Sequence, residues 1–299
     1  MSYQRRYRNC DITMRDDFAI FIMVHGRPDK MWTSFSLRKC GYTGKIYYVA
    51  DDLDSTLQGY KEKYKDDLIV FNKKSAALKY DSGDNTGDLR STLYAANTIF
   101  ELARERGIVY FMIMCDDYLG FTYKYDEYLN LVEIPARRLD DIVDVMIEYF
   151  DGTNCLTLAM AQMGDFIGGK NSEFGKGPSI KRKAMNTFLC SIDRPFQFMG
   201  RLNEDVTTYV NLGNKGYLFF TISNVAIHQT QTQSQKGGIT EAYLDSGTYT
   251  KSFFSVMYNP SCVKVSMMGE QHKRLHHRIT WKNAVPCILN EKYKVIQSG

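Results

Sequence analysis

The sequence lacks several signals that would assign it quickly to a class. It has no Cys-x-x-Cys pair, and its seven cysteines are scattered, which argues against a zinc ribbon or a disulfide scaffold and favours a reducing compartment. It has neither the GxGxxG nor the GxxxxGK[ST] motif, so dinucleotide and P-loop nucleotide binding are unsupported. No apolar run approaches membrane-spanning length, and the basic start has no apolar signal core. We therefore expect a cytoplasmic protein that does not contact a membrane.

The composition is that of an ordinary globular protein. The 299 residues are 44% hydrophobic and 24% charged, which allows one large α/β domain or two smaller ones. A net charge of +4 permits a phosphate or nucleic-acid partner but does not require one. The 21 tyrosines and 17 phenylalanines are many, and aromatic residues in such numbers often line binding clefts as well as cores.

Strands and helices alternate through the first part of the chain. Its short apolar runs are typical of strands buried on both faces, and the segments between them have helical spacing. The expected strands are 18–24, 45–50, 68–71 and 108–114, and the expected helices are 31–39, one that ends near 63, and 89–106. This order predicts an α/β fold with a Rossmann-like, mostly parallel sheet flanked by helices.

The remainder is less regular and predicts a mixed α+β half. The expected helices are about 137–150, one that starts near 201, and about 240–257, and the expected strands are 154–160, 187–191 and 217–222. The expected loops and linkers are 72–88, 121–128, 229–238 and a solvated tail around 272–278. Since no linker clearly divides the chain, we predict one domain with a basic lead-in at 1–16 and two halves, 17–120 and 121–299.

Charged residues follow the expected strands of the first half. Asp116 and Asp117 come after the strand at 108–114, and Arg27 and the pair Asp51 and Asp52 follow the first two strands. Because the carboxyl ends of parallel strands share one edge of a sheet, these groups can converge. Carboxylates together with substrate phosphates commonly hold Mg²⁺ or Mn²⁺, so the edge predicts a metal–diphosphate site. The alternative is ordinary turn and helix-cap chemistry, for which aspartate is well suited.

The second half adds candidates whose roles are more open. Glu204 and Asp205 open an expected helix and could deprotonate an acceptor hydroxyl, or could simply be stabilised by the helix dipole. His228 could complete a metal shell, although a lone histidine is often only packed or hydrogen-bonded. Two basic groups could contact a phosphate backbone or could be solvated surface. These groups are Lys181, Arg182 and Lys183, and Arg274 and Arg278.

Several segments, taken together, resemble one family. They are 18–28 (FAIFIMVHGRP), 41–47 (GYTGKIY), 193–196 (DRPF), 200–205 (GRLNED), 231–238 (QTQSQKGG) and 243–249 (YLDSGTY). Broadly, the strand-end carboxylates resemble the GT-A class of nucleotide-sugar glycosyltransferases. More narrowly, the segments resemble phage DNA glycosyltransferases, the TET/JBP-associated glycosyltransferases, which are related to the base J glucosyltransferase. The resemblance covers roughly residues 17–285.

This resemblance implies a fold, a reaction and a set of roles. It implies a GT-A-like single domain that moves a sugar from a nucleotide donor, with a UDP-sugar expected, to a 5-hydroxymethylpyrimidine in DNA. Cytosine is the favoured base, and the cytoplasm of a phage-infected host is the expected location. The implied roles are metal binding by Asp117, with His228 as a further candidate ligand, and donor binding by Arg27, Asp51, Asp52, Arg90, Asn97 and Asp116. Glu204 and Asp205 match the position that supplies the base in inverting members, and Asp205 is expected to remove the acceptor proton. Lys181–Lys183 with Arg274 and Arg278 would grip DNA.

One position departs from the family pattern. A strict D-x-D motif would need aspartate where this chain has Cys115, which weakens the expectation of metal dependence without removing it. Two other readings stay open. The chain could be a nucleotidyltransferase that releases pyrophosphate, or a DNA-binding or structural protein on a decayed transferase scaffold. The sugar, the exact base, the anomeric outcome and the oligomeric state are also open.

Overall fold

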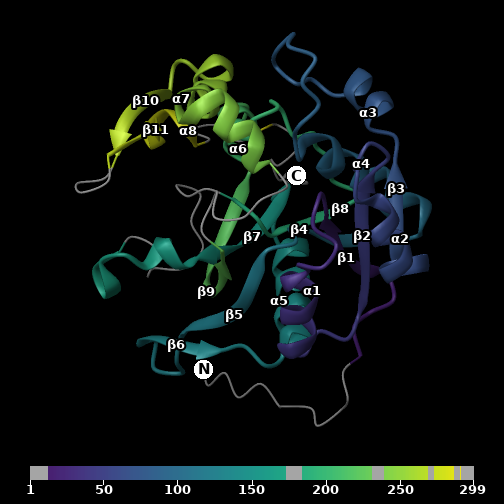
Figure 1. Cartoon of the computed structure of the whole chain (residues 1–299). Helices are drawn as coiled ribbons and strands as arrows, with labels where there is room; N and C mark the ends of the chain where they lie inside the picture. The colour runs from purple at the N-terminus through teal and green to yellow at the C-terminus, as the bar shows by residue number, and fades with distance from the viewer. Residues whose placement is uncertain (1–12, 173–183, 231–238, 269–272, 286–289, 291–299) are drawn as a thin grey trace, which may run out of the picture.

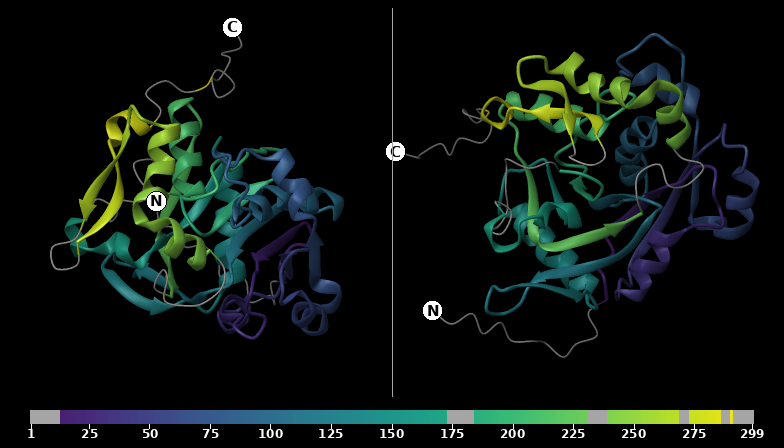
Figure 2. Two further views of the ribbon diagram at one scale, coloured as in Figure 1. Left: turned by 45° about the horizontal axis from the view of Figure 1, so that its top comes forward. Right: turned by 60° about the vertical axis from the view of Figure 1, so that its left-hand side comes forward.

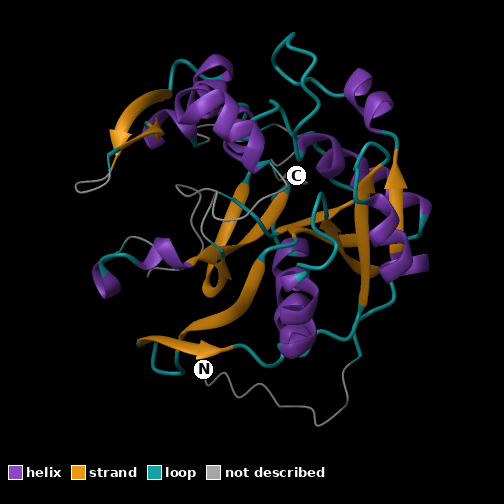
Figure 3. Cartoon of the chain, viewed as in Figure 1, coloured by secondary structure: helices purple, strands orange, loops and turns teal. Residues whose placement is uncertain are grey.

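Helices cover both faces of one large sheet in the computed structural model (Figures 1 and 3), which describes residues 13–172, 184–230, 239–268, 273–285 and 290. The strands of this sheet are β1 Phe18–Met23, β2 Lys45–Asp51, β3 Leu68–Phe71, β4 Tyr110–Cys115, β5 Tyr118–Tyr125, β6 Leu131–Pro135, β7 Thr157–Gln162, β8 Phe188–Ser191 and β9 Phe219–Gln229. The helices are α1 Trp32–Lys39, α2 Leu57–Tyr64, α3 Lys73–Lys79, α4 Leu93–Glu105, α5 Leu139–Asp151, α6 Glu204–Asn214, α7 Thr240–Tyr258 and α8 Trp281–Ala284.

The sheet joins a parallel half to a mixed half. Its order is β3-β2-β1-β4-β8-β7-β9-β5-β6. The first four strands in this order are parallel, and β8 pairs antiparallel with both β4 and β7. In the other half, β9 runs parallel to β7 but antiparallel to β5. The predicted Rossmann-like half is confirmed, and the whole is compatible with the expected GT-A-like single domain. The division at residue 120 stays a prediction.

The strands are apolar on both sides because each side of the sheet has its own core. Along β1, Phe21 faces the core under α4 and α6, whereas Ile20 and Ile22 face the core under α1, α2 and α5. Helical spacing supplies the complementary faces, for example Ile99 of α4. Two-sided burial explains why the strands of the parallel half have continuous apolar runs instead of alternating patterns.

A small hairpin lies outside the main sheet and packs on α7 (Figure 2). Its strands, β10 Val263–Met268 and β11 Arg274–Ile279, pair antiparallel. The prediction of a solvated tail is therefore wrong for this segment, because His277 is buried and contacts Asn203. Among the described residues, no helix is both long and apolar enough to cross a membrane.

Two further segments differ from the expected loops. Helix α3 lies within 72–88, where the Asn72 side chain accepts a hydrogen bond from the Ser75 backbone amide and caps the helix. The aromatic segment after residue 120 continues strand β5, in which Phe121 faces the core. The first segment looks like a loop because α3 exposes most of its residues, and the second because β5 runs into an exposed turn at 127–130. Of the expected loop 229–238, residues 231–238 lie outside the described part.

Candidate active site

The Asp116–Asp117 turn lies between the end of β4 and the start of β5, and helix α1 fixes its backbone. Thr33, in the first turn of α1, donates its amide N–H to the Asp116 carbonyl at 3.2 Å. Its hydroxyl donates to the Cys115 carbonyl at 2.6 Å and accepts the Tyr118 N–H at 2.9 Å. Three backbone groups of the turn are thus satisfied by one residue, so the two carboxylates are presented from a rigid frame.

Asp116 is paired with Arg27, which follows β1. The guanidinium Nε donates to Asp116 Oδ2 at 2.7 Å and a terminal nitrogen donates to Oδ1, a bidentate arrangement. Asp116 is only 2% exposed, and this burial raises the pKa of its carboxyl, while the Arg27 guanidinium opposes the rise. The two predicted donor-binding residues therefore do meet, and each fixes the orientation of the other.

Asp117 accepts hydrogen bonds from two neutral side chains. Gln229 Nε2 donates to Oδ1 at 3.1 Å and the Thr230 hydroxyl donates to Oδ2 at 3.0 Å. Both donors are neutral, so they orient the carboxylate without neutralising it. Among the described residues, no group of three or more His, Cys, Asp or Glu side chains could hold a metal ion. A cation here would therefore rely on Asp117 together with substrate oxygens, as Mg²⁺ sites in phosphate-handling enzymes commonly do.

His228 is adjacent to Gln229 in β9 but contacts a different group. Its Nε2 lies 2.5 Å from the Thr122 hydroxyl. Successive side chains of a strand point to opposite faces of the sheet, and Gln229 is the residue that reaches Asp117. The structure therefore brings Gln229, which the sequence interpretation missed, to the predicted metal carboxylate. His228 as a metal ligand stays a prediction.

Asp51, at the end of β2, belongs to a buried charge cluster. Its Oδ2 accepts from Lys73 Nζ at 3.0 Å and lies 3.1 Å from His25 Nδ1. Burial alone would raise the pKa of Asp51, but the bond with His25 and the charge of Lys73 outweigh it and lower the pKa. Lys73 comes two residues after β3, so the strand-end rule could have found it. Asp52 instead accepts the Lys73 backbone N–H at 2.9 Å, which is turn chemistry.

Glu204 and Asp205 open α6, directly after Asn203, whose φ of 59° is left-handed. The Thr92 hydroxyl, at the start of α4, donates to Glu204 Oε1. Burial, followed by the charge of Asp205, raises the pKa of Glu204 to about 7. Asp205 accepts the Val206 backbone N–H at 2.7 Å. A carboxyl that titrates near neutrality is typical of a group that accepts and releases a proton during catalysis.

The turn after β4 and the start of α6 are linked by electrostatic interactions. Burial raises the pKa of the Cys115 thiol well above its usual range, and the charges of Asp117, Asp116 and Glu204 add to the rise. The carboxylates from both halves of the chain therefore act on the same buried thiol. The thiol stays neutral there, so Cys115 does not replace the missing carboxylate of a D-x-D motif.

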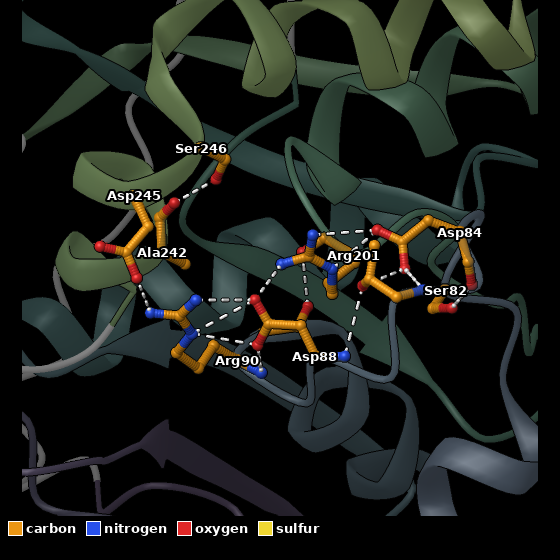
Figure 4. Close-up of polar contacts among 10 residues, drawn as sticks. Ser82, Asp84, Asp88, Arg90, Arg201, Ala242, Asp245 and Ser246 are labelled. Atoms are coloured by element: carbon orange, nitrogen blue, oxygen red, sulfur yellow. Dashed lines mark hydrogen bonds and ion pairs between the residues drawn. The ribbon is translucent and has the colours of Figure 1, made fainter.

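Arg90 and Asn97, both predicted to face the donor, have protein partners. Arg90 binds Asp88 and, at 2.5 Å, Asp245 of α7 (Figure 4). The Asn97 amide donates to the Phe198 carbonyl at 3.0 Å and accepts the Phe198 N–H at 2.7 Å. These two hydrogen bonds satisfy the buried Asn97 side chain without a ligand. A donor role for either residue stays a prediction.

The predicted DNA-binding residues are only partly described. Lys181, Arg182 and Lys183 lie outside the described residues. Arg274 and Arg278 both belong to β11, and Arg278 is exposed. Both strands of this hairpin contact α7, the helix that also carries Tyr243. The pKa of Tyr243 is raised by burial and by the charges of Glu204 and Asp205, so α7 connects the hairpin to the site.

Arg201 ties the two loops that precede α4 and α6 (Figure 4). Its guanidinium contacts Asp84 and Asp88, each at 2.9 Å, and its side chain is 4% exposed. Because Arg201→Met would leave the partly buried Asp84 without its cation and Asp88 with Arg90 alone, we expect the free energy of unfolding to fall by about 2 kcal/mol. Urea denaturation measures this. Arg137→Met, at an exposed arginine, should change the free energy of unfolding by less than about 0.5 kcal/mol. Equal values for the two variants would contradict the role of Arg201, Asp84 and Asp88 as a clamp between the two loops.

Comparison with known proteins supports one family. No curated protein matches the chain. The model of the TET-associated glycosyltransferase family matches residues 18–238, which is more than half of the 299 residues and runs from β1 past the end of β9. The matched range contains the turn after β4, Asp51 with its partners, and the start of α6. The chain therefore belongs to the TET-associated glycosyltransferase family.

Proposed function

We propose that this glycosyltransferase moves a sugar from a UDP-sugar to the hydroxymethyl group of a 5-hydroxymethylpyrimidine in DNA, with cytosine as the favoured base. We also propose that it acts in the cytoplasm of a phage-infected host. The proposal rests on the family match together with two carboxylates that both act on the buried Cys115 thiol: Asp117, and Glu204, whose pKa is raised to about 7. One carboxylate suits a diphosphate-bound cation and the other suits proton removal, which are the two needs of a transfer from a nucleotide sugar.

The donor side is built from groups at the strand ends. Asp117, oriented by Gln229 and Thr230, would hold Mn²⁺ or Mg²⁺ together with diphosphate oxygens. Such a cation would offset the charge that develops on the leaving diphosphate. The bidentate pair of Arg27 and Asp116 sits directly beside Asp117, where it adds fixed hydrogen-bond donors but no net charge.

The acceptor side uses the pair Glu204 and Asp205. In direct displacement, the acceptor oxygen forms a bond to the anomeric carbon as the bond from that carbon to the diphosphate oxygen breaks. The hydroxyl proton passes to a carboxylate of the pair, and the nucleoside diphosphate leaves. We assign this role to Glu204, whose pKa of about 7 suits proton transfer at neutral pH, in place of the expected Asp205. A single displacement of this kind inverts the anomeric carbon.

Access to DNA sets a further requirement. A hydroxymethyl group at the pyrimidine 5-position points into the major groove, and a deep site is reached only after the base is flipped out. Contacts to flanking phosphates would hold the duplex during this step. We assign these contacts to Lys181, Arg182, Lys183, Arg274 and Arg278.

The products distinguish this proposal from its main rival. The protein is incubated with Mn²⁺, a panel of UDP-sugars, and DNA that contains either 5-hydroxymethylcytosine or unmodified cytosine. The proposal expects UDP release that depends on the hydroxymethyl group. In a parallel reaction with nucleoside triphosphates in place of the UDP-sugars, release of pyrophosphate would indicate a nucleotidyltransferase instead. UDP release at the same rate with unmodified DNA would contradict the proposed acceptor.

A further inference from the structure

One hydrogen bond crosses between the helices that flank the site. Thr92 and Glu204 are 112 residues apart in sequence, yet the Thr92 hydroxyl donates to Glu204 Oε1. Resting on the proposed function, we infer that Thr92 is a positioning residue: it holds the Glu204 carboxylate in one orientation and favours the ionised form that accepts the acceptor proton. Thr92 need not touch a substrate to do this.

The hydrogen bonding of the Thr92 hydroxyl supports this role. Thr92 occupies the position before the first residue of α4, where threonine hydroxyls commonly cap their own helix. Here the hydroxyl makes no capping bond to α4. It is directed instead to a carboxylate on another helix. Thr92 therefore lies at a capping position but makes a tertiary contact instead of a cap.

The neighbours of Thr92 keep it in place. The Ser91 hydroxyl donates to the Arg201 carbonyl at 2.7 Å, three residues before Glu204. The Arg201 amide donates to the Ser82 carbonyl at 2.7 Å, and its guanidinium binds Asp84 and Asp88. Figure 4 shows this clamp. The loops before α4 and α6 are thus joined at several points, so the Thr92–Glu204 contact is held by its surroundings.

Several charged groups from different elements face Glu204. Asp205, its neighbour in α6, raises the pKa of Glu204, whereas Lys251 of α7 lowers it. Tyr243 of α7 and Cys115 at the end of β4 also interact with it. The bond from Thr92 lowers the pKa of Glu204 because a donor stabilises the carboxylate form. Removing that donor therefore has a predictable sign.

The test compares three variants by their pH profiles. Thr92→Val removes the donor with little change in shape, and the acid limb of kcat/KM should move to higher pH by about one unit. Activity at pH 7 should fall roughly fivefold and recover near pH 9. Thr92→Ser restores the donor and should restore the profile. Thr98→Val, the same substitution at a threonine of α4 that bonds within its own helix, should keep the wild-type profile.

A titration without substrate separates this inference from the proposed function. The Glu204 carboxyl, assigned by comparison with Glu204→Gln, is followed by carbon-13 NMR in the wild type and in Thr92→Val. An upward shift of its pKa in the variant supports the inference, and identical pKa values overturn it. Full activity of Glu204→Gln would instead refute the catalytic assignment of Glu204, while the titration would still report on Thr92.

Discussion

Asp117→Asn is expected to lower kcat/KM for sugar transfer by about 10²–10³-fold while the protein stays folded. The substitution keeps the shape and an oxygen acceptor for Gln229 or Thr230, so the local bonds can largely persist. It removes the negative charge that would hold the cation against the diphosphate. Since the charge acts mainly as the diphosphate leaves, kcat should fall in addition to any rise in KM.

The Asp117 prediction needs a matched control and a separate measure of folding. Asp66→Asn is the same change at an exposed aspartate in the 3₁₀ turn 65–67, away from the site, and should keep wild-type kinetics. Circular dichroism and thermal unfolding should be alike for both variants. Calorimetric titration with Mn²⁺ and UDP should show weaker binding for Asp117→Asn alone. Wild-type activity of Asp117→Asn would contradict the assignment.

Glu204→Gln is expected to lower kcat/KM by about 10²–10⁴-fold, because a neutral amide cannot accept the acceptor proton. In the wild type, activity should rise with pH through the pKa of Glu204, about 7, as the carboxylate forms. The residual activity of Glu204→Gln should lack this acid limb. The measurement is kcat/KM at fixed donor from pH 5 to 9.

Glu204→Gln is expected to lower activity but to raise stability. The pKa of Glu204 is raised from its ordinary value of 4.5 to about 7 in the folded protein, so folding favours the protonated form. The stability of the wild type therefore falls as pH rises from about 4.5 to 7 and is level above that window. Glu204→Gln escapes this loss. At pH 8 we expect the free energy of unfolding of Glu204→Gln to be about 2 kcal/mol higher than that of the wild type, because solvent screening at this partly exposed carboxyl limits the effect. At pH 4 the two free energies should be nearly equal.

Chemical denaturation at the two pH values decides the stability prediction. The difference between the variants should grow from pH 4 to pH 8. A constant difference would mean that folding does not favour the protonated form of Glu204. Together with the kinetic result, a growing difference would show that the chain sacrifices stability to keep a proton acceptor partly buried.

The parallel half of the sheet and its strand-end carboxylates could be predicted from sequence because the governing rules are local. An apolar run followed by a carboxylate marks the end of a buried strand, and parallel pairing brings such ends to one edge. Strand β4 therefore delivers Asp116 and Asp117 beside β1 and Arg27, as the pattern indicates. The start of α6 was marked by its acidic first turn.

Other features depend on contacts between distant segments, which no local pattern contains. Thr92, for example, reaches Glu204 across 112 residues. The orientation of His228 depends on the pairing of β9 with β5, where a register shift lies between Tyr118 and Gly120. A bulge of this kind changes which side chains share a face, so alternation counted in the sequence alone cannot assign it.

The central claim is that a sugar reaches the hydroxymethyl group of a DNA base, and the mass of that base tests it most directly. DNA with 5-hydroxymethylcytosine or 5-hydroxymethyluracil is incubated with the protein, Mn²⁺ and a UDP-sugar panel, and is then digested to nucleosides for mass spectrometry. The account predicts a gain of one sugar residue on a hydroxymethylated nucleoside, and none with Asp117→Asn. An unchanged nucleoside mass with every donor, from wild-type protein that is folded, would contradict it.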